Sequence, residues 1–216
     1  MIRTFEYIDV LYLIAAARWT LLLTLTAFIG SAAVGIVIAI LRVTPIAPFR
    51  WVALVYTQVV QGTPLLVWLF LIYFGIAALG FRMNPWAAAA VAFAIYGGAF
   101  LGEIWRGALI SIAKTQWEAG ASLGLSFGQQ LRYVIVPQSI RVAIPPTIGF
   151  LVQLIKNTSL AATIGLVELT REGQLTAAVT FSPLAVYLTV AAIYFAMCFP
   201  LTQWSRHLER RYHVAR

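Results

Sequence analysis

The stretch Gln116–Pro137, QWEAGASLGLSFGQQLRYVIVP, differs from the rest of a chain that is overwhelmingly apolar. It mixes an acid, amides, glycines and a base between two long hydrophobic runs. A segment this polar is excluded from hydrocarbon, because its hydrogen-bonding groups would have no partners there. We therefore expect it to lie in water at one face of a membrane, where another protein can contact it.

The composition indicates that the remaining chain is surrounded by lipid. Hydrophobic residues make up 62% of the 216 positions and charged residues 10%, against roughly 45–50% and about 25% in a soluble domain. The mean hydropathy is +0.89, and the seven Trp, nine Tyr and thirteen Phe suit the interfacial belts of a membrane protein. We expect one all-α, polytopic membrane domain over residues 1–216, embedded in the lipid bilayer.

Apolar stretches predict five transmembrane helices, because each is near the roughly 20 residues that cross a bilayer. Gly62, Thr63 and Pro64 interrupt the second stretch. We expect a kink or break there, since proline removes a backbone hydrogen bond and glycine loosens the helix. The five stretches cover about residues 19–41, 52–79, 86–112, 140–162 and 183–204.

The segments outside these stretches carry three further expectations. Residues 1–18 place apolar side chains at near-helical spacing, which predicts a short amphipathic helix lying on the membrane. A cleaved signal peptide is the alternative, and the acidic leader and the apolar run that continues to Leu41 argue against it. The polar segment around Val167–Thr180 is expected to form a loop, and the chain is expected to end in a basic tail.

Five spans place the two termini on opposite sides of the membrane. By the positive-inside rule the face richer in Lys and Arg is cytoplasmic, so the N-terminus lies outside and the C-terminus and Gln116–Pro137 lie inside. The net charge of +8 is scattered between the spans, so no nucleic-acid partner is expected. The cytoplasmic bases are Arg42, Arg50, Lys114, Arg132, Arg206, Arg210, Arg211 and Arg216, and the outer face holds Arg3, Arg82 and Arg171, diluted by Glu6, Asp9, Glu168 and Glu172.

The sequence contains no pattern for covalent chemistry. Neither Lys114 nor Lys156 follows a glycine, so there is no P-loop for ATP. His207 and His213 lack metal-ligand spacing, and Cys198 lies in an apolar run where core packing is its expected role. We expect no catalytic residue, no metal and no cofactor in this chain.

A spaced motif lies within the polar stretch. Glu118, Ala119 and Gly120 are followed by Gly124 after three residues and by Val134–Pro137 after nine more. This pattern resembles the EAA motif of ABC-importer permeases, in which Glu-Ala-Ala, three residues, Gly and nine residues precede Ile-x-Leu-Pro. The resemblance implies a type I ABC importer-like fold with five transmembrane helices and a cytoplasmic coupling helix, in a bacterial inner membrane.

The residues of this stretch also suit a docking helix on physical grounds. Small side chains permit close approach, Leu123 and Leu125 offer apolar anchors, and Glu118 offers a charge to a basic partner. A short helix held in a partner's groove transmits rigid-body motion to the flanking spans, whereas the alternative is an ordinary cytoplasmic loop. The predicted coupling segment covers about residues 116–126, and its predicted contact residues are Glu118, Ala119, Gly120, Leu123, Gly124 and Pro137.

The resemblance extends over roughly residues 15–205. It is closest to the polar amino-acid branch, the histidine, glutamine, arginine and opine permeases, although Gln61 stands where that branch commonly has arginine. It implies an importer with a second permease subunit, identical or related, an extracytoplasmic substrate-binding protein, and a cytoplasmic ABC ATPase dimer that uses ATP and Mg. The motifs that carry it are Gly62–Leu66, Gly98–Glu103, Arg106–Gly107, Pro145–Pro146 and Lys156–Leu160.

Polar residues within the spans are candidates for a substrate path, because a charge at membrane depth faces a cavity or a partner. Lys156 is expected near a substrate carboxylate, or alternatively in a salt bridge to Glu103 or snorkelling. Glu103 and Arg106 share a helix face and are expected to pair, although an intramembrane acid also hints at a cationic substrate. The predicted path residues are Thr63, Leu65, Glu103, Lys156, Asn157, Thr158 and Ser159.

Small residues recur every four positions at Ala90, Ala94, Gly98 and Gly102, which predicts close helix packing within the chain or across a dimer. Two other functions compete with the importer subunit. A self-sufficient secondary transporter or channel is disfavoured because no internal repeat is visible. A membrane-embedded enzyme is disfavoured because the spans supply no acid, base or metal set.

Overall fold

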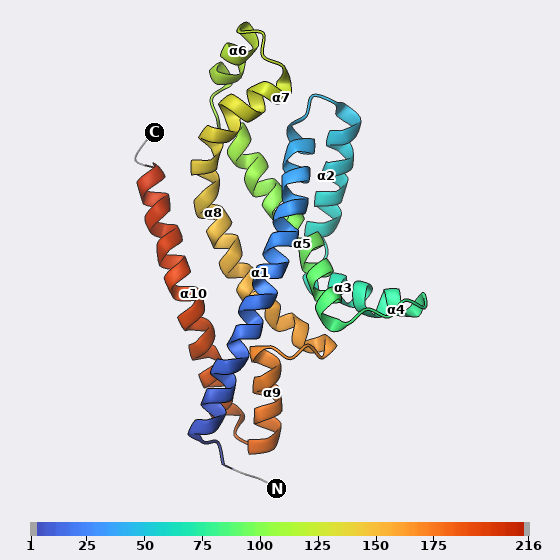
Figure 1. The fold of residues 1–216 in the computed structure, drawn as a ribbon, viewed down its shortest axis with the longest axis vertical. Coiled ribbons are helices and arrows are strands. Elements are labelled where there is room, and N and C mark those ends of the chain that lie inside the picture. Colours follow the sequence, from blue (N-terminus) through green and yellow to red (C-terminus); the bar gives the residue numbers. More distant parts are fainter. Residues whose placement is uncertain (1–3, 214–216) are drawn as a thin grey trace.

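The computed structural model describes residues 4–213, and within that range every regular element is a helix (Figure 1). The start of α1 and the end of α10 lie towards opposite ends of the molecule, with α9 near the former and α6 at the end towards which α10 runs. The elements are α1 (Tyr7–Val43), α2 (Ala47–Gln61), α3 (Leu65–Phe70), a π-helical turn (Leu71–Gly75), α4 (Ile76–Ala78), α5 (Pro85–Ile110), α6 (Lys114–Ser122), α7 (Phe127–Gln130), a second π-helical turn (Leu131–Ile135), α8 (Val136–Asn157), a 3-10 helix (Thr158–Ile164), α9 (Leu169–Thr180) and α10 (Pro183–His213).

Four helical segments in the described range are long and apolar enough to cross a membrane, and a bent pair supplies a fifth. That pair is α2 with α3–α4, which meet at an angle of 99°. The break falls at Gly62–Pro64, so the predicted interruption is confirmed. Figure 1 shows α3 and α4 projecting sideways from the body as a consequence.

The helices α1 and α5 pack closely against each other. A Cβ added at Gly98 would lie 2.4 Å from Val34 Cγ1, and one at Gly102 would lie 2.6 Å from Ile38 Cγ2. Ala94 lies against Gly30 in the same way. The small-residue stripe therefore brings two helices of one chain together, which decides between the two alternatives left by the sequence.

The prediction of a separate surface helix at residues 1–18 is wrong. Tyr7–Val43 forms one continuous helix, and its first half packs through Leu13 and Ala17 against Leu169, Val186 and Val190. Tertiary contacts with α9 and α10 thus replace the expected contact with the membrane surface. Arg3 lies outside the described residues.

The prediction of a loop over Val167–Thr180 is also wrong, because Leu169–Thr180 forms α9. Its buried residues recur at helical spacing, which is a signal that the polar composition concealed. The last span is likewise longer than expected, since α10 continues through the predicted basic tail to His213. Arg216 lies outside the described residues. The buried α9 residues are Leu169, Gly173, Thr176 and Thr180.

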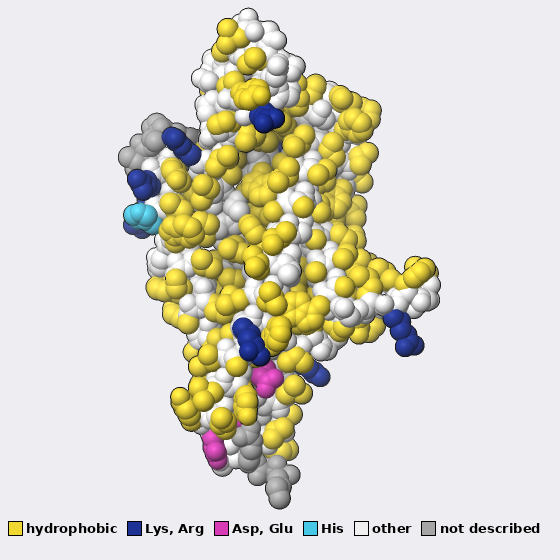
Figure 2. All heavy atoms as spheres, viewed as in Figure 1, with side chains coloured by type: hydrophobic (Ala, Val, Ile, Leu, Met, Phe, Trp, Pro, Cys, Tyr) yellow, Lys and Arg dark blue, Asp and Glu magenta, His cyan; other side chains and the backbone are white. Residues whose placement is uncertain are grey.

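The surface matches a lipid environment. Figure 2 shows hydrophobic side chains over the middle of the visible face and Lys and Arg side chains towards its ends. Helices of sufficient length combined with this exposed apolar surface identify a multi-pass membrane protein.

Candidate functional site

The polar stretch folds into a helical hairpin made of α6 and α7, which projects from one end of the bundle (Figure 1). Trp117 and Phe127 stack across the hairpin, with ring centroids 6.0 Å apart and an interplanar angle of 17°. Gln130 donates through Nε2 to the carbonyl oxygen of Leu125 at 2.8 Å. Ser126 caps α7 in a reciprocal pair with Gln129. The hairpin is therefore a preformed structure.

Gly124 ends α6 and turns the chain towards α7. Its φ is +74°, in the left-handed region that glycine occupies without a Cβ penalty. The amide of Leu125 donates to the carbonyl of Gly120 at 3.1 Å, and that of Gly124 donates to Ala121 at 2.9 Å. These two bonds form a Schellman motif, so the glycine in the EAA-like spacing has a defined structural role.

The other glycine of the motif, Gly120, faces the interior of the hairpin. It is the buried residue of α6, and an added Cβ would lie 3.0 Å from Gln130 Cγ. The glycine that replaces the alanine of the EAA motif therefore accommodates the side chain of Gln130 in α7.

The outer face of α6 is open. Leu123 is 80% exposed, and Glu118 makes only a surface ion pair with Lys114 at 3.2 Å. An apolar side chain this exposed at the tip of a polar hairpin is a candidate contact for another protein. The predicted coupling residues that lie exposed are Glu118, Ala119, Leu123 and Gly124, with Pro137 exposed at the start of α8.

An ion triad joins the last turn of α1 to the C-terminal part of α5. Glu103 accepts from Arg106 Nε at 2.7 Å and from Arg42 Nε at 2.8 Å, one arginine on each carboxylate oxygen. The predicted Glu103–Arg106 pair is confirmed, and Arg42, expected only as a topology-setting charge, joins it. Glu103 pairs with these two arginines and not with Lys156, which was the alternative partner predicted from the sequence.

An exposed stripe runs along α8. Its members are separated by three or four residues and so share one helix face. Towards α10 the stripe borders a cavity of about 330 Å³, where Ser205 donates to the carbonyl of Pro145 at 2.9 Å. Gln153 was missed from the sequence, although its spacing of three from Lys156 places both on this face. The stripe consists of Gln138, Val142, Pro146, Gly149, Gln153 and Lys156.

The other predicted path residues lie in different environments. Asn157 is half-buried beside the stripe, whereas the hydroxyl of Thr158 is buried and donates to the carbonyl of Ile155. Ser159 donates to the carbonyl of Lys156 at 2.7 Å. Leu65 lies in the main core at 5% exposure, and Thr63 donates to Val59 at the α2–α3 break.

At the opposite end of the molecule, Glu168 is fully buried. It caps α9 by accepting from the amide of Arg171 at 2.9 Å. Its second carboxylate oxygen accepts from Tyr194 Oη at 3.0 Å and from Thr20 Oγ1 at 3.2 Å. Burial raises the pKa of the Glu168 carboxyl, against the lowering effect of these hydrogen bonds.

Comparison with known proteins agrees with the hairpin and the spans. The family described as binding-protein-dependent transport system inner membrane component matches residues 31–214. The chain belongs to this family.

Several relatives of this inner membrane component are transport permeases. This chain is 38% identical to the glutamine transport system permease protein GlnP of Escherichia coli, over 94% of this chain and 93% of that protein. It is 38% identical to the L-cystine transport system permease protein TcyB of Bacillus subtilis over 89% of this chain and 83% of that one. A solved amino acid ABC transporter with histidines superposes with a TM-score of 0.87 at 32% identity, covering 97% of this chain and 100% of that one.

The buried carboxyl of Glu168 is expected to make the stability of this transport component depend on pH. Because the folded pKa of Glu168 is raised above its ordinary value of 4.5, its favourable contribution is complete below pH 4.5 and is lost as pH rises through the folded pKa. The melting temperature of the wild type minus that of Glu168→Gln should therefore fall between pH 4.5 and pH 8, measured by thermal unfolding in detergent. Glu172→Gln, in the same helix, is the control, and a difference that rises with pH would contradict the assignment.

Proposed function

We propose that this chain is a permease subunit of an ATP-driven importer for polar amino acids. The observation that carries the proposal is the preformed α6–α7 hairpin, which exposes Leu123 and Glu118 between the ends of α5 and α8. A rigid hairpin in this position converts a pull from a partner into movement of two membrane helices. In this assignment the α6 end is cytoplasmic and the N-terminus of α1 is outside, as the positive-inside rule predicts.

Partner subunits supply the remaining parts of the machine. This sequence carries no P-loop, so a separate ATPase binds ATP and Mg. Two copies of that ATPase contact the hairpin. An extracytoplasmic binding protein delivers substrate to the α9 end. Closure of the ATPase pair shifts the permease between states that open to one side or the other.

The exposed stripe of α8 is the wall of the translocation path in this proposal. Gln153 and Lys156 are polar side chains at membrane depth, where polar groups are costly unless they face a cavity or a partner. A second permease subunit, identical or related, lies opposite this stripe and completes the path. Lys156 and Asn157 then lie near a substrate carboxylate, while Glu103 is neutralised by two arginines and does not select a cationic substrate.

The substrate class rests on the relatives. The names of similar proteins specify glutamine and cystine, and the similar solved structure is an amino acid transporter. We infer that this chain serves the same class, with the choice among amino acids made largely by the binding protein.

Binding of the ATPase to the α6–α7 hairpin tests the proposal. Leu123→Asp should weaken binding of the ATPase by about 2 kcal/mol or more, roughly 30-fold, because an anchor at an interface centre carries this much. Co-purification of the ATPase and substrate-stimulated ATP hydrolysis report the loss. Leu79→Asp is a matched control, since Leu79 is 77% exposed against 80% for Leu123 and precedes the Gly80–Asn84 loop at the far end of α4.

Glu118→Arg is a second variant on the exposed face of α6 and should act in the same direction. Both variants should insert in the membrane normally, because neither side chain contributes to the core. Unchanged co-purification of the ATPase with both variants would refute the coupling role of the hairpin.

A further inference from the structure

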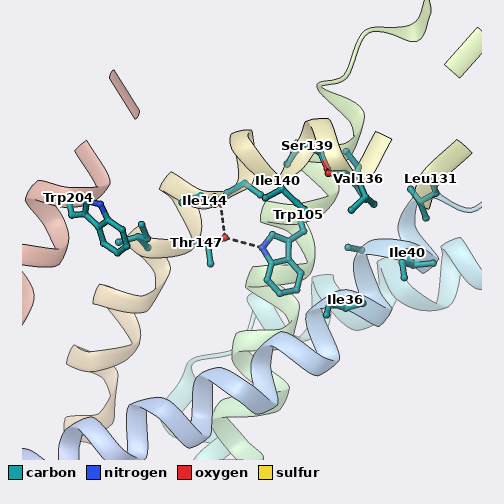
Figure 3. A pocket seen from close by; sticks show the side chains of 15 residues that line it. Ile36, Ile40, Trp105, Leu131, Val136, Ser139, Ile140, Ile144, Thr147 and Trp204 are labelled. Carbon is teal, nitrogen blue, oxygen red and sulfur yellow. Dashed lines mark hydrogen bonds between the residues drawn. The ribbon is translucent and has the colours of Figure 1, made fainter. Parts of the chain in front are cut away.

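A large apolar cavity lies on the side of α8 that faces α1 and α5 (Figure 3). Its volume is about 580 Å³, within the range of pockets that hold small ligands. Figure 3 shows Trp204 of α10 at one edge and Ile36 and Ile40 of α1 at the other, with Trp105 of α5 between them. The cavity is separate from the exposed α8 stripe, because no residue is common to both linings.

The two hydroxyl groups of the lining and the indole N–H of Trp105 are already paired within the protein. Trp105 Nε1 donates to Thr147 Oγ1 at 3.0 Å, and Thr147 donates to the carbonyl of Ala143 at 2.7 Å (Figure 3). Ser139 donates to the carbonyl of Val136 at 3.1 Å. The lining therefore offers an amino acid no charged side chain and few free hydrogen-bonding groups, whereas a hydrocarbon chain needs none.

Two exposed arginines adjoin residues of the cavity lining in the sequence. Arg132 and Arg141 each follow directly on a lining residue, Leu131 and Ile140, and both are exposed. Neither forms an ion pair with any acid in the range 4–213. Arginine binds phosphate oxygens through its planar set of N–H donors, so these two side chains complement an anionic phosphate.

The cavity lies near the C-terminal ends of α1 and α5, and α5 is the helix that precedes the hairpin. Its lining includes Ile40 of α1, which ends at Val43, and Leu109 of α5, which ends at Ile110. The orientation given under the proposed function makes this the cytoplasmic leaflet, where anionic lipids attract basic side chains. The inference rests on that proposal for its orientation.

We propose that this cavity binds an acyl chain of an anionic phospholipid, with the phosphate held by Arg132 and Arg141. The acyl chain of the lipid contacts α5 and α8, which are the helices before and after the hairpin in the sequence. An occupied cavity therefore fills the space into which these helices would otherwise close, and lipid occupancy becomes linked to the movement that the ATPase drives.

The test is competitive lipid retention. The full chain, purified with its copurifying subunits in mild detergent, is exposed to equal amounts of dioleoylphosphatidylglycerol and dioleoylphosphatidylcholine, and bound lipid is counted by native mass spectrometry. The wild type should retain phosphatidylglycerol preferentially. Arg132→Gln combined with Arg141→Gln should reduce that preference roughly tenfold or more, given the attraction of each base for anionic lipid, while Arg82→Gln, an exposed arginine in the loop after α4, should not.

A second variant tests the acyl-chain site separately. Ala143→Phe places bulk inside the cavity and should abolish retention of both lipids, whereas Ile29→Phe adds bulk on the exposed side of α1, where Ile29 is 60% exposed, and should not. The arginine variants keep the test valid if Ala143→Phe fails to fold. Bromination of the lipid chains should also quench tryptophan fluorescence less in Trp204→Phe than in the wild type.

Three results would overturn the inference. Equal retention of the two lipids would remove the role of the arginines, and retention unaffected by Ala143→Phe would place the lipid elsewhere. Disulfide cross-linking between two copies of Ala143→Cys would assign the cavity to a second permease subunit. The Leu123→Asp experiment does not depend on these outcomes, so failure here is distinguishable from failure of the importer assignment.

Discussion

Replacing Gly98 with leucine is expected to abolish correct packing of α1 on α5. The first added carbon would lie 2.4 Å from Val34 Cγ1 and 2.6 Å from Val34 Cβ. The Cβ atom is fixed to the backbone, so rotation of the valine side chain does not relieve the clash. Overpacking typically costs about 1–3 kcal/mol, and a full leucine side chain at this contact should cost at least the upper figure. Thermal unfolding in detergent and the monodisperse fraction on gel filtration measure the effect.

Gly107 supplies a matched control in the same helix. An atom added at its Cβ position would meet nothing within 4 Å. Gly107→Ala should therefore not destabilise the protein and should stabilise it by up to about 1 kcal/mol, because alanine is the better helix former. Equal destabilisation by Gly98→Leu and Gly107→Ala would show that the α1–α5 contact does not limit stability.

Replacing Glu103 with glutamine is the second change with a large expected effect. It preserves the shape of the side chain and removes the charge that neutralises Arg42 and Arg106. Breaking a buried ion pair from one side costs about 3–5 kcal/mol, because the remaining charges lose their compensation. We expect a loss near the lower end, since Glu103 is 23% exposed. The same unfolding measurement reports it.

The surface pair of α6 provides the control for this variant. Glu118 and Lys114 form an ion pair of similar chemistry, with side chains 60% and 88% exposed. Exposed pairs contribute roughly 0–1 kcal/mol, so Glu118→Gln should leave the melting temperature nearly unchanged. A Glu103→Gln variant as stable as Glu118→Gln would mean that solvent screens the triad.

Local sequence signals were sufficient for several parts of this protein. The polar stretch between apolar runs predicted the water-facing hairpin, and the spacing of Glu118, Gly124 and Pro137 indicated its family. Gly62 and Pro64 predicted the break between α2 and α3. Each of these features depends on groups close together in the chain, such as a missing amide or a positive φ, and the residue types report them directly.

Two errors show where local reading fails. The first residues of α1 and the whole of α9 looked like a surface helix and a loop, because their polar side chains dilute the apolar pattern. Both are ordered by one shared contact, the cluster of Leu13, Leu169 and Val186. Neither segment contains its own partner, so its local sequence does not reveal the packing that orders it.

The sequence by itself determined an all-helical membrane protein with a polar segment between two spans, because hydropathy and backbone-breaking residues act locally. Only the tertiary structure decided which charges and hydroxyls meet. Arg42 reaches Glu103 across 61 positions, and Thr20 reaches Glu168 across 148. The close approach of α1 to α5 and the packing of α9 make these contacts, and a buried carboxylate is stable only where such partners arrive together.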